Sequence, residues 1–347
     1  MLAPSPASAL THGDRFFSAE DGLRLYFRDY PGENGNIECD TRGVSQPLPR
    51  EGGGGWEGAW ALTAAKPPPR SSPAFAGEEV LKRRPPGEGH DRPVVLCLPG
   101  LARNSKDFGT LAPHLAAQGY RVLAPDYRGR GRSAYDDNWQ HYHPRTYLSD
   151  LRHLLTLTGV HRVIALGTSL GGIMAMAMGV LMPTVLAGVV LNDVGPDLPP
   201  AGLTRILAYL SEDRPQPDWE AARRNVQRLL PQLALADDAA WMRLARATYR
   251  EDKDGLLHFD WDPNIVRPLL EDRTPRPDLW PLFRSLRHLP VLALRGGISD
   301  ILTQDTYNRM ATEHPALIRV QAPGIGHAPT LDEPQLQEAI DEFLGRC

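Results

Sequence analysis

Residues Val163–Gly172 read VIALGTSLGG, and this segment decides the predicted fold. Four apolar residues lead towards a serine, Ser169, which has glycines two positions before and two positions after it, and a helix-prone segment, Ile173–Ala177, follows. The pattern predicts a strand, a sharp turn and a helix, with glycines that keep the backbone from colliding and a serine hydroxyl that points outward. The amides at the start of such a helix favour the negative charge that develops in acyl transfer. We therefore predict that Ser169 is a nucleophile, although an ordinary Gly/Ser loop between a strand and a helix can show the same pattern.

The composition favours small-molecule chemistry in a globular enzyme. The chain has 347 residues, 41% of them hydrophobic, which is enough for one large α/β domain or two modest ones. The formal net charge is −4 and the basic residues are scattered, so we expect no nucleic acid and no membrane surface as a partner. The three cysteines lie far apart, which argues against a disulfide framework or a zinc site and favours a cytoplasmic location. No export signal and no membrane span are expected, since no apolar run approaches about 18 residues. The oligomeric state stays open.

The N-terminal part predicts a hairpin followed by an insertion. Asp21 and Gly22 lie between two strand-like runs within Arg15–Tyr30, which is a hairpin signal. Residues 31–90 then hold 11 glycines and 9 prolines, a composition that cannot pack a core. Parts of this segment resemble peptides encoded by mobile palindromic elements within bacterial genes. We expect residues 31–90 to be a dispensable, disordered insertion.

After residue 90 the pattern alternates strands with helices, which predicts a mostly parallel, doubly wound sheet. Between residues 196 and 285 the rhythm stops, and helices interrupted by prolines suggest a cap over the carboxyl ends of the strands, where ligands of open α/β sheets bind. We expect residues 12–30, 91–195 and 286–347 to form the core and residues 196–285 the helical cap. The predicted strands are Val94–Leu98, Arg121–Ala124, Arg162–Leu166, Leu186–Asn192, Val291–Arg295 and Leu317–Gln321, and the predicted helices are Phe108–Gln118, Thr146–Thr158, Leu170–Leu181 and Pro334–Leu344.

A serine nucleophile needs a histidine base and an acid that orients it. Asp300 follows the strand Val291–Arg295, and His327 lies on a glycine-flanked loop between the last strand and the closing helix. Taken alone, Asp300 is equally well explained as a turn aspartate, and His327 as a solvated loop histidine. Serine, then aspartate, then histidine, each just past a strand, is nevertheless the chain order expected of the α/β-hydrolase arrangement.

At these residues the chain resembles the α/β-hydrolase superfamily, over roughly residues 12–30 and 92–345. The motifs that carry the resemblance are Leu98–Leu101, Pro125–Ser133, Gly167–Gly171 and Gly326–His327. The resemblance implies an α/β-hydrolase fold with a helical cap, Ser169 as nucleophile, Asp300 as acid and His327 as base. It further implies an oxyanion hole formed by the backbone amides of Leu101 and Leu170. Family members often have a histidine where this chain has Pro99, which stiffens the loop but removes a hydrogen bond.

Other polar groups in the sequence offer alternative roles. Asp193, just past Leu186–Asn192, occupies the position from which some relatives draw their acid, and we favour Asp300 over it. Asp126 is interpreted as a structural loop residue. The histidines at 141, 143 and 153 form no metal-ligand pattern with nearby carboxylates or cysteines, so we expect no metal and no cofactor.

The expected reaction is hydrolysis of a small carboxylic ester through an acyl-enzyme. Dehalogenases and epoxide hydrolases of similar fold use an aspartate nucleophile and are disfavoured. Carbon–carbon bond hydrolases and enol-lactonases of aromatic degradation remain alternatives, as does a non-catalytic binding protein of the same fold. Aromatic cap residues could line an apolar pocket or form the core of the cap, and arginines of the cap leave room for a substrate carboxylate. These aromatic residues are Trp241, Tyr249, Trp261, Trp280 and Phe283, and the arginines are Arg205, Arg243 and Arg246.

Overall fold

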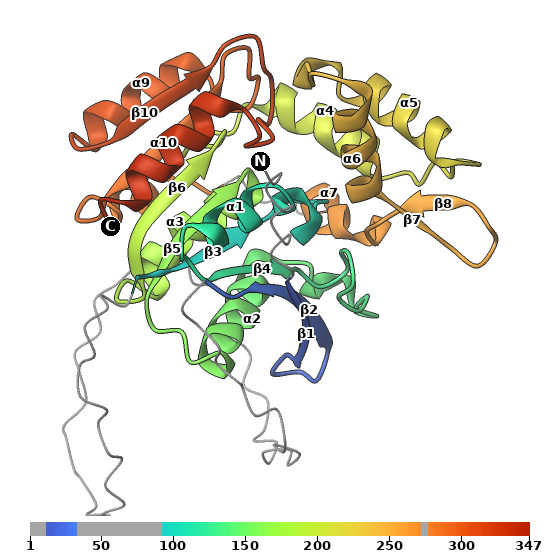
Figure 1. Ribbon diagram of the computed structural model, residues 1–347, viewed down its shortest axis with the longest axis horizontal. Coiled ribbons are helices and arrows are strands. Elements are labelled where there is room, and N and C mark those ends of the chain that lie inside the picture. The colour runs from blue at the N-terminus through green and yellow to red at the C-terminus, as the bar shows by residue number, and fades with distance from the viewer. Residues whose placement is uncertain (1–11, 33–91, 272–276) are drawn as a thin grey trace, which may run out of the picture. The chain divides into compact units, whose positions relative to one another are not determined.

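The computed structural model describes residues 12–32, 92–271 and 277–347 (Figure 1). Apart from its first two residues, the predicted insertion at 31–90 lies outside the described residues. In the described part of the chain, no helix combines the length and the apolar character needed to cross a membrane.

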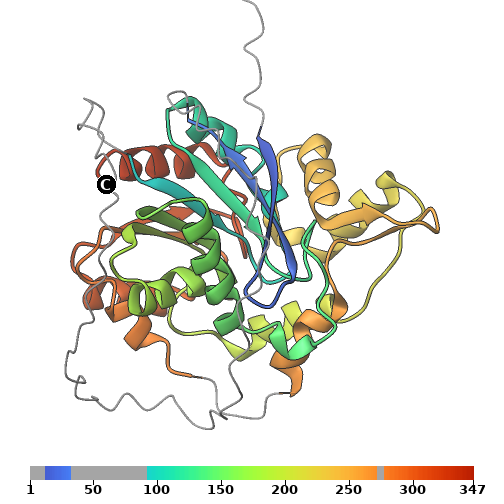
Figure 2. The ribbon, with the colours of Figure 1, turned by 90° about the horizontal axis from the view of Figure 1, so that it is seen from below.

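The centre of the fold is an eight-stranded sheet with the order β1-β2-β4-β3-β5-β6-β9-β10. The first two strands form the predicted antiparallel hairpin, which pairs antiparallel with β4 at one side of the sheet (Figure 2), and the remaining neighbours are all parallel. The mostly parallel α/β-hydrolase sheet predicted from the sequence is therefore confirmed. The strands are β1 (Gly13–Ser18), β2 (Arg24–Tyr30), β3 (Val94–Leu98), β4 (Val122–Asp126), β5 (Val163–Thr168), β6 (Leu186–Asn192), β9 (Val291–Gly296) and β10 (Ile318–Ala322).

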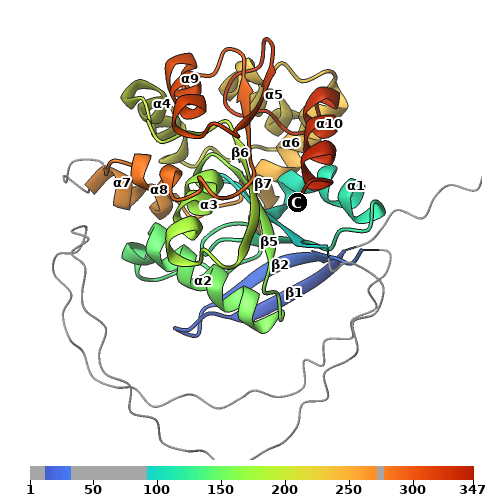
Figure 3. The same cartoon turned by 90° about the vertical axis from the view of Figure 1, so that its left-hand side faces the viewer.

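Helices cover both faces of this sheet (Figure 3). Alternate residues of the strands point to opposite faces. Leu96 and Ala165 belong to one buried apolar cluster with α2 and α3, whereas Val95 and Ile164 belong to a second cluster with α1 and α10. The helices on the first face are α2 (Pro144–Leu157), α3 (Leu170–Leu181), α8 (Trp280–Arg284) and α9 (Gln304–Glu313), and those on the second are α1 (Leu111–Ala117) and α10 (Pro334–Leu344).

Between β6 and β9 the chain leaves the sheet and forms a mainly helical segment, which we call the cap. Asp218 and Asp237 accept hydrogen bonds from backbone amides of the first turns of α5 and α6, so both helices begin with a capping aspartate. The cap also contains a two-stranded hairpin that the sequence analysis missed, although Asp254 and Gly255 are a turn signal. Its elements are α4 (Pro200–Leu210), α5 (Trp219–Leu229), α6 (Asp238–Thr248), β7 (Tyr249–Glu251), β8 (Leu257–Phe259) and α7 (Arg267–Glu271).

Two further elements differ from the prediction. The expected helix at Phe108–Gln118 begins only at Leu111, because a short 3-10 turn, Ser105–Phe108, precedes it and ends at Gly109. Pro113 then lies in the first turn of the helix, where its missing amide costs no hydrogen bond. Helix α9 was not predicted.

Candidate active site

Ser169 lies between the end of β5 and the start of α3, in a backbone conformation with φ 53° and ψ −115°. Residues other than glycine rarely have a positive φ, and such strain is concentrated at functional sites. The flanking glycines explain how the turn closes: a side-chain carbon at Gly171 would overlap the carbonyl of Leu98, and one at Gly167 would overlap the backbone of Gly171. The strand, turn and helix predicted around this serine are thus present.

A chain of hydrogen bonds connects three side chains that are distant in sequence. The hydroxyl of Ser169 lies 2.9 Å from Nε2 of His327, and Nδ1 of His327 lies 2.7 Å from Oδ2 of Asp193. The Asp193 side chain is completely buried, and that of His327 is 8% exposed. With Nδ1–H donating to the carboxylate, Nε2 is left free to accept the proton of the serine hydroxyl. This is the geometry expected of a nucleophile, a base and an orienting acid.

Further donors hold the carboxylate of Asp193 in place. The residue directly follows β6, with φ 55°. Its Oδ1 accepts the backbone N–H of Gly296 at 2.8 Å, and its Oδ2 accepts the hydroxyl of Ser299 at 2.7 Å in addition to His327. Three donors therefore compensate the buried negative charge. Ser299 was not singled out by the sequence analysis, and its neighbour Asp300 was.

Asp300, the acid expected from the sequence, does not take part in this arrangement. Its carboxylate forms a two-point ion pair with Arg205 of α4, with both N–O distances at 2.8 Å, and its side chain is 46% exposed. The hydrogen bonds from Arg205 hold the pKa of Asp300 below its ordinary value. The prediction of Asp300 is therefore corrected to Asp193. One signal favoured Asp193: it directly follows its strand, whereas Asp300 lies four residues beyond the end of β9.

The loop that carries His327 is clamped by the cap. The backbone N–H of Gly326 donates to the carbonyl of Gln232 at 2.8 Å, and the side-chain amide of Gln232 donates to the carbonyl of His327 at 3.3 Å. A side chain at position 326 would overlap that of Gln232. On the sheet side, Asn192 donates to the carbonyl of Pro329 at 2.9 Å. No local pattern in the sequence marks Gln232, because its role arises from contact between distant segments.

The two amides expected to form the oxyanion hole border the nucleophile. Leu170 opens α3 directly after Ser169, and the loop containing Leu101 passes so close that a side-chain carbon at Gly100 would lie 3.8 Å from Cβ of Ser169. Buried Arg130 donates to the carbonyl of Leu101 at 2.8 Å and so fixes this loop. Within the described part of the chain, neither amide has a hydrogen-bond acceptor. Leu101 and Leu170 remain the predicted oxyanion donors.

A cavity of about 410 Å³ opens onto Ser169 and His327. Its apolar wall comes largely from the cap, through Ile206, Tyr209, Leu210, Leu230, Leu233, Leu235 and Leu244. The five aromatic residues that were expected in the cap do not line it, and two of them, Trp280 and Phe283, lie on α8 against the sheet rather than in the cap. They are buried in the apolar cluster that joins the cap to the core, so they serve as packing residues.

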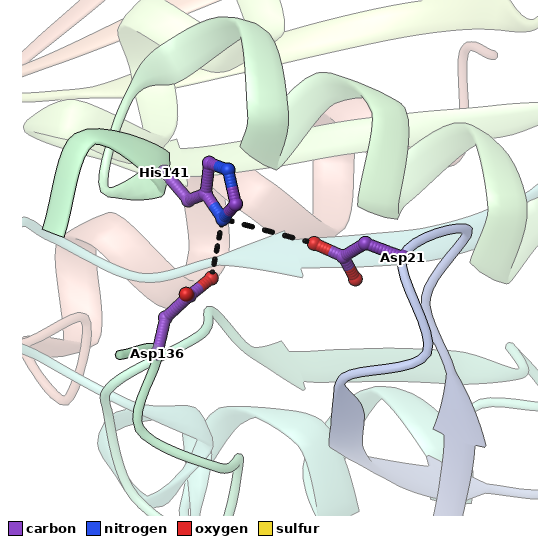
Figure 4. Close-up of side chains that lie close together, drawn as sticks. All are labelled: Asp21, Asp136 and His141. Carbon is purple, nitrogen blue, oxygen red and sulfur yellow. Dashed lines mark hydrogen bonds and ion pairs between the residues drawn. The ribbon is translucent and has the colours of Figure 1, made fainter. Parts of the chain in front are cut away.

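A second polar group lies away from this cavity, where the fold brings His141 together with two carboxylates (Figure 4). Its Nδ1 is 2.9 Å from Asp136 and 3.9 Å from Asp21. One guanidinium nitrogen of buried Arg128 contacts both carboxylates, at 2.6 and 2.7 Å, and the same side chain pairs with Asp150. The sequence predicts no metal-ligand pattern around His141, and the structure brings two carboxylates to its ring. Arg128 already supplies the positive charge that this group needs, so we assign it no metal.

The sheet and the hydrogen-bonded Ser–His–Asp set have the arrangement expected of the α/β-hydrolase superfamily. Comparisons with known proteins agree with this family. The model of the alpha/beta hydrolase family matches residues 95–339. A 3-hydroxybutyrate-oligomer hydrolase from Cupriavidus necator is 33% identical over 264 residues, which cover 73% of this chain and 88% of that protein. An sn-1-specific diacylglycerol lipase from Danio rerio is 26% identical over 72% of this chain and 76% of its own length. The crystal structure of an alpha/beta hydrolase from Novosphingobium aromaticivorans has a TM-score of 0.77 and 36% identity, covering 97% of this chain and 99% of that one. The chain belongs to the alpha/beta hydrolase family.

Proposed function

We propose that the protein hydrolyses small carboxylic esters through an acyl-enzyme formed on Ser169. The observation that carries the proposal is the connected set Ser169–His327–Asp193, which opens into a cavity with a mainly apolar cap wall. The side chains of Asp193 and His327 are 0% and 8% exposed, and their burial strengthens the electrostatic interaction between them.

In the first half-reaction, His327 accepts the proton of Ser169 while the serine oxygen attacks the ester carbonyl. The tetrahedral intermediate carries its negative charge on the former carbonyl oxygen, for which the amides of Leu101 and Leu170 are the proposed donors. One such donor typically contributes about 3 to 4 kcal/mol to the transition state. Protonated His327, held by the carboxylate of Asp193, then gives its proton to the leaving alcohol, and the acyl group stays on the serine.

In the second half-reaction, a water molecule takes the place of the alcohol. His327 removes a proton from the water, the resulting hydroxide attacks the acyl carbon, and collapse of the second tetrahedral intermediate releases the carboxylic acid. The proton returns to Ser169 through His327, so the enzyme is regenerated without a cofactor.

The relatives favour esters over the alternative bonds. Two relatives are named for the hydrolysis of 3-hydroxybutyrate oligomers and of diacylglycerols, and both kinds of molecule contain carboxylic ester bonds. The first of these is the more similar to this chain. Short oligoesters of hydroxy acids are therefore the first natural substrates that we propose to test. Carbon–carbon hydrolysis and enol-lactone hydrolysis need the same nucleophile and base, so a panel of esters, lactones and vinylogous diketones would rank them.

Labelling with a fluorophosphonate probe tests whether the serine is catalytic. We expect the probe to form one covalent adduct on Ser169, and we expect Ser169→Ala to lose both the adduct and p-nitrophenyl butyrate turnover while remaining folded. Ser105→Ala is a matched control, since Ser105 is buried outside this hydrogen-bonded set. A folded wild-type protein that neither reacts with the probe nor cleaves any member of the panel would favour a non-catalytic binding protein instead.

A further inference from the structure

Charged side chains line the cavity unevenly. Its wall includes the cations Arg28, Arg103, Lys106, Arg243 and Arg246, and only two anions, Asp107 and Asp332. A cavity with an excess of one charge raises the local concentration of ligands of the opposite charge. The position of a bound anion depends on which of these cations still lacks a close partner.

Two of the cations are already neutralised within the protein. Arg103 pairs with Asp107 through two nitrogens and donates to the hydroxyl of Thr248. Lys106 lies 2.7 Å from the carboxylate of Asp260. Neither is available to a ligand without the loss of these contacts.

The other arginines differ in what they contact. Arg205, one of the three cap arginines considered for a substrate carboxylate, is occupied by Asp300. The guanidinium of Arg28 contacts the hydroxyl of Tyr30 at 3.5 Å. Arg246 lies over the ring of Trp219, with its guanidinium carbon 4.6 Å from the ring centre, and Trp219 does not border the cavity.

Arg243, on α6, combines access to the cavity with a weak internal partner. Its side chain is 59% exposed, and the nearest carboxylate, that of Asp332, lies 3.7 Å away, which is too far for a hydrogen bond. Asp332 borders the same cavity and follows His327 by five residues. Burial raises the pKa of Asp332, and the charge of nearby Arg243 opposes this rise. The five donors of the guanidinium are therefore largely free to meet a ligand at the rim of the cavity.

We propose that Arg243 binds a carboxylate of the substrate, so that the preferred substrates are esters of acids that carry a second, ionised carboxyl group. This inference rests on the proposed ester hydrolysis. A planar guanidinium matches a carboxylate in a two-point contact, which fixes both the position and the direction of the ligand. Monoesters of dicarboxylic acids have this chemistry, with the free carboxylate on the acyl side of the bond that is cleaved.

The competing explanation is structural: Arg243 and Asp332 could form an ion pair that fastens the cap to the loop after His327. The two roles predict opposite effects for Asp332. A receptor for carboxylates improves when Asp332→Asn removes the competing negative charge, whereas a fastening contact is lost equally in Arg243→Gln and Asp332→Asn.

The test uses pairs of p-nitrophenyl esters that have the same chain length and differ in charge. The anionic members are the monoesters of glutaric and adipic acid, and the neutral members are the pentanoate and the hexanoate. For each variant of the full-length protein, the readout is the ratio of kcat/KM for the anionic ester to that for the neutral one. Arg224→Gln is the matched control, because Arg224 is exposed to a similar degree, 58%, and lies on α5 away from the cavity.

We expect the ratio to fall about 5- to 10-fold in Arg243→Gln, which is the size of a lost charge-assisted hydrogen bond at a partly exposed site. The loss should lie mainly in KM, since this contact is made equally in the ground state and the transition state. Asp332→Asn should raise the ratio, Arg224→Gln should keep the wild-type value, and added salt should lower the wild-type ratio. An unchanged ratio in Arg243→Gln, or a parallel fall in Arg243→Gln and Asp332→Asn, would overturn the inference while leaving ester hydrolysis intact. Absence of turnover with all four esters would instead remove the proposed function, and this inference with it.

Discussion

Replacement of Asp193 or of Asp300 by asparagine tests which of these two aspartates acts as the acid for His327. In Asp193→Asn, an amide replaces a carboxylate that now accepts three hydrogen bonds. If the amide oxygen of the new asparagine still accepts the hydrogen bond from the N–H of Gly296, its NH₂ group faces His327 and Ser299. Nδ1 of His327 must then act as an acceptor, which places the ring proton on Nε2, opposite the serine hydroxyl, so that the base cannot accept the proton of Ser169.

The magnitude follows from this change of tautomer. The same exchange in another serine hydrolase lowers kcat by about 10⁴-fold, which corresponds to about 5.4 kcal/mol of transition-state stabilisation. We expect a fall of about 10³- to 10⁴-fold in kcat for Asp193→Asn. Asp300→Asn removes only an exposed ion pair with Arg205, a contact worth about 0.2 to 1 kcal/mol of stability, and should leave kcat within about twofold of wild type.

The assay is steady-state hydrolysis of p-nitrophenyl butyrate at high enzyme concentration, with urea unfolding of each variant as the check on folding. The reasoning would be refuted by a folded Asp193→Asn that retains more than about a tenth of the wild-type kcat, or by a folded Asp300→Asn that loses more than about 100-fold, the scale of losing a catalytic proton transfer.

Two further predictions concern the cap. Gln232→Ala removes the side-chain amide that donates to the carbonyl of His327, so kcat should fall about tenfold with little change in KM. The control Gln227→Ala, at an exposed position of α5, should have no effect on kcat. Equal losses of kcat in the two variants would contradict this role of Gln232. His258 contacts Asp213 at 2.6 Å and Asp254 at 2.9 Å, and these hydrogen bonds raise the pKa of His258. The contribution of protonated His258 to stability is therefore complete below about pH 6.5 and is lost as the pH rises through the raised pKa. Urea midpoints measured across this range should fall with rising pH more steeply in the wild type than in His258→Gln, and parallel curves would count against the contact.

Much of the fold could be predicted from local sequence because its signals are local. The segment around Ser169 shows its strand, its glycines and its helix within fifteen residues, and α3 begins and ends where the pattern predicts. The hairpin around Asp21 and Gly22 could be predicted for the same reason. The hairpin of the cap carries a similar turn signal but has strands of only three residues, too short for a clear alternation.

The choice of acid could not be settled from the sequence, because β6 and β9 are adjacent and parallel, so Asp193 and Asp300 both follow carboxyl ends at the same edge of the sheet. Which of them reaches His327 depends on the positive φ of Asp193, on the hydroxyl of Ser299 and on the capture of Asp300 by Arg205. Each of these is a contact between distant segments or a backbone angle.

Detection of the covalent intermediate tests the central claim most directly. Wild-type protein mixed with p-nitrophenyl butyrate and quenched in acid within the first turnover should yield a peptide containing Ser169 whose mass is increased by one butyryl group. In Ser169→Ala the adduct and the turnover should both be absent. Sustained ester turnover in Ser169→Ala, or wild-type turnover with the acyl group on a different residue, would contradict the account.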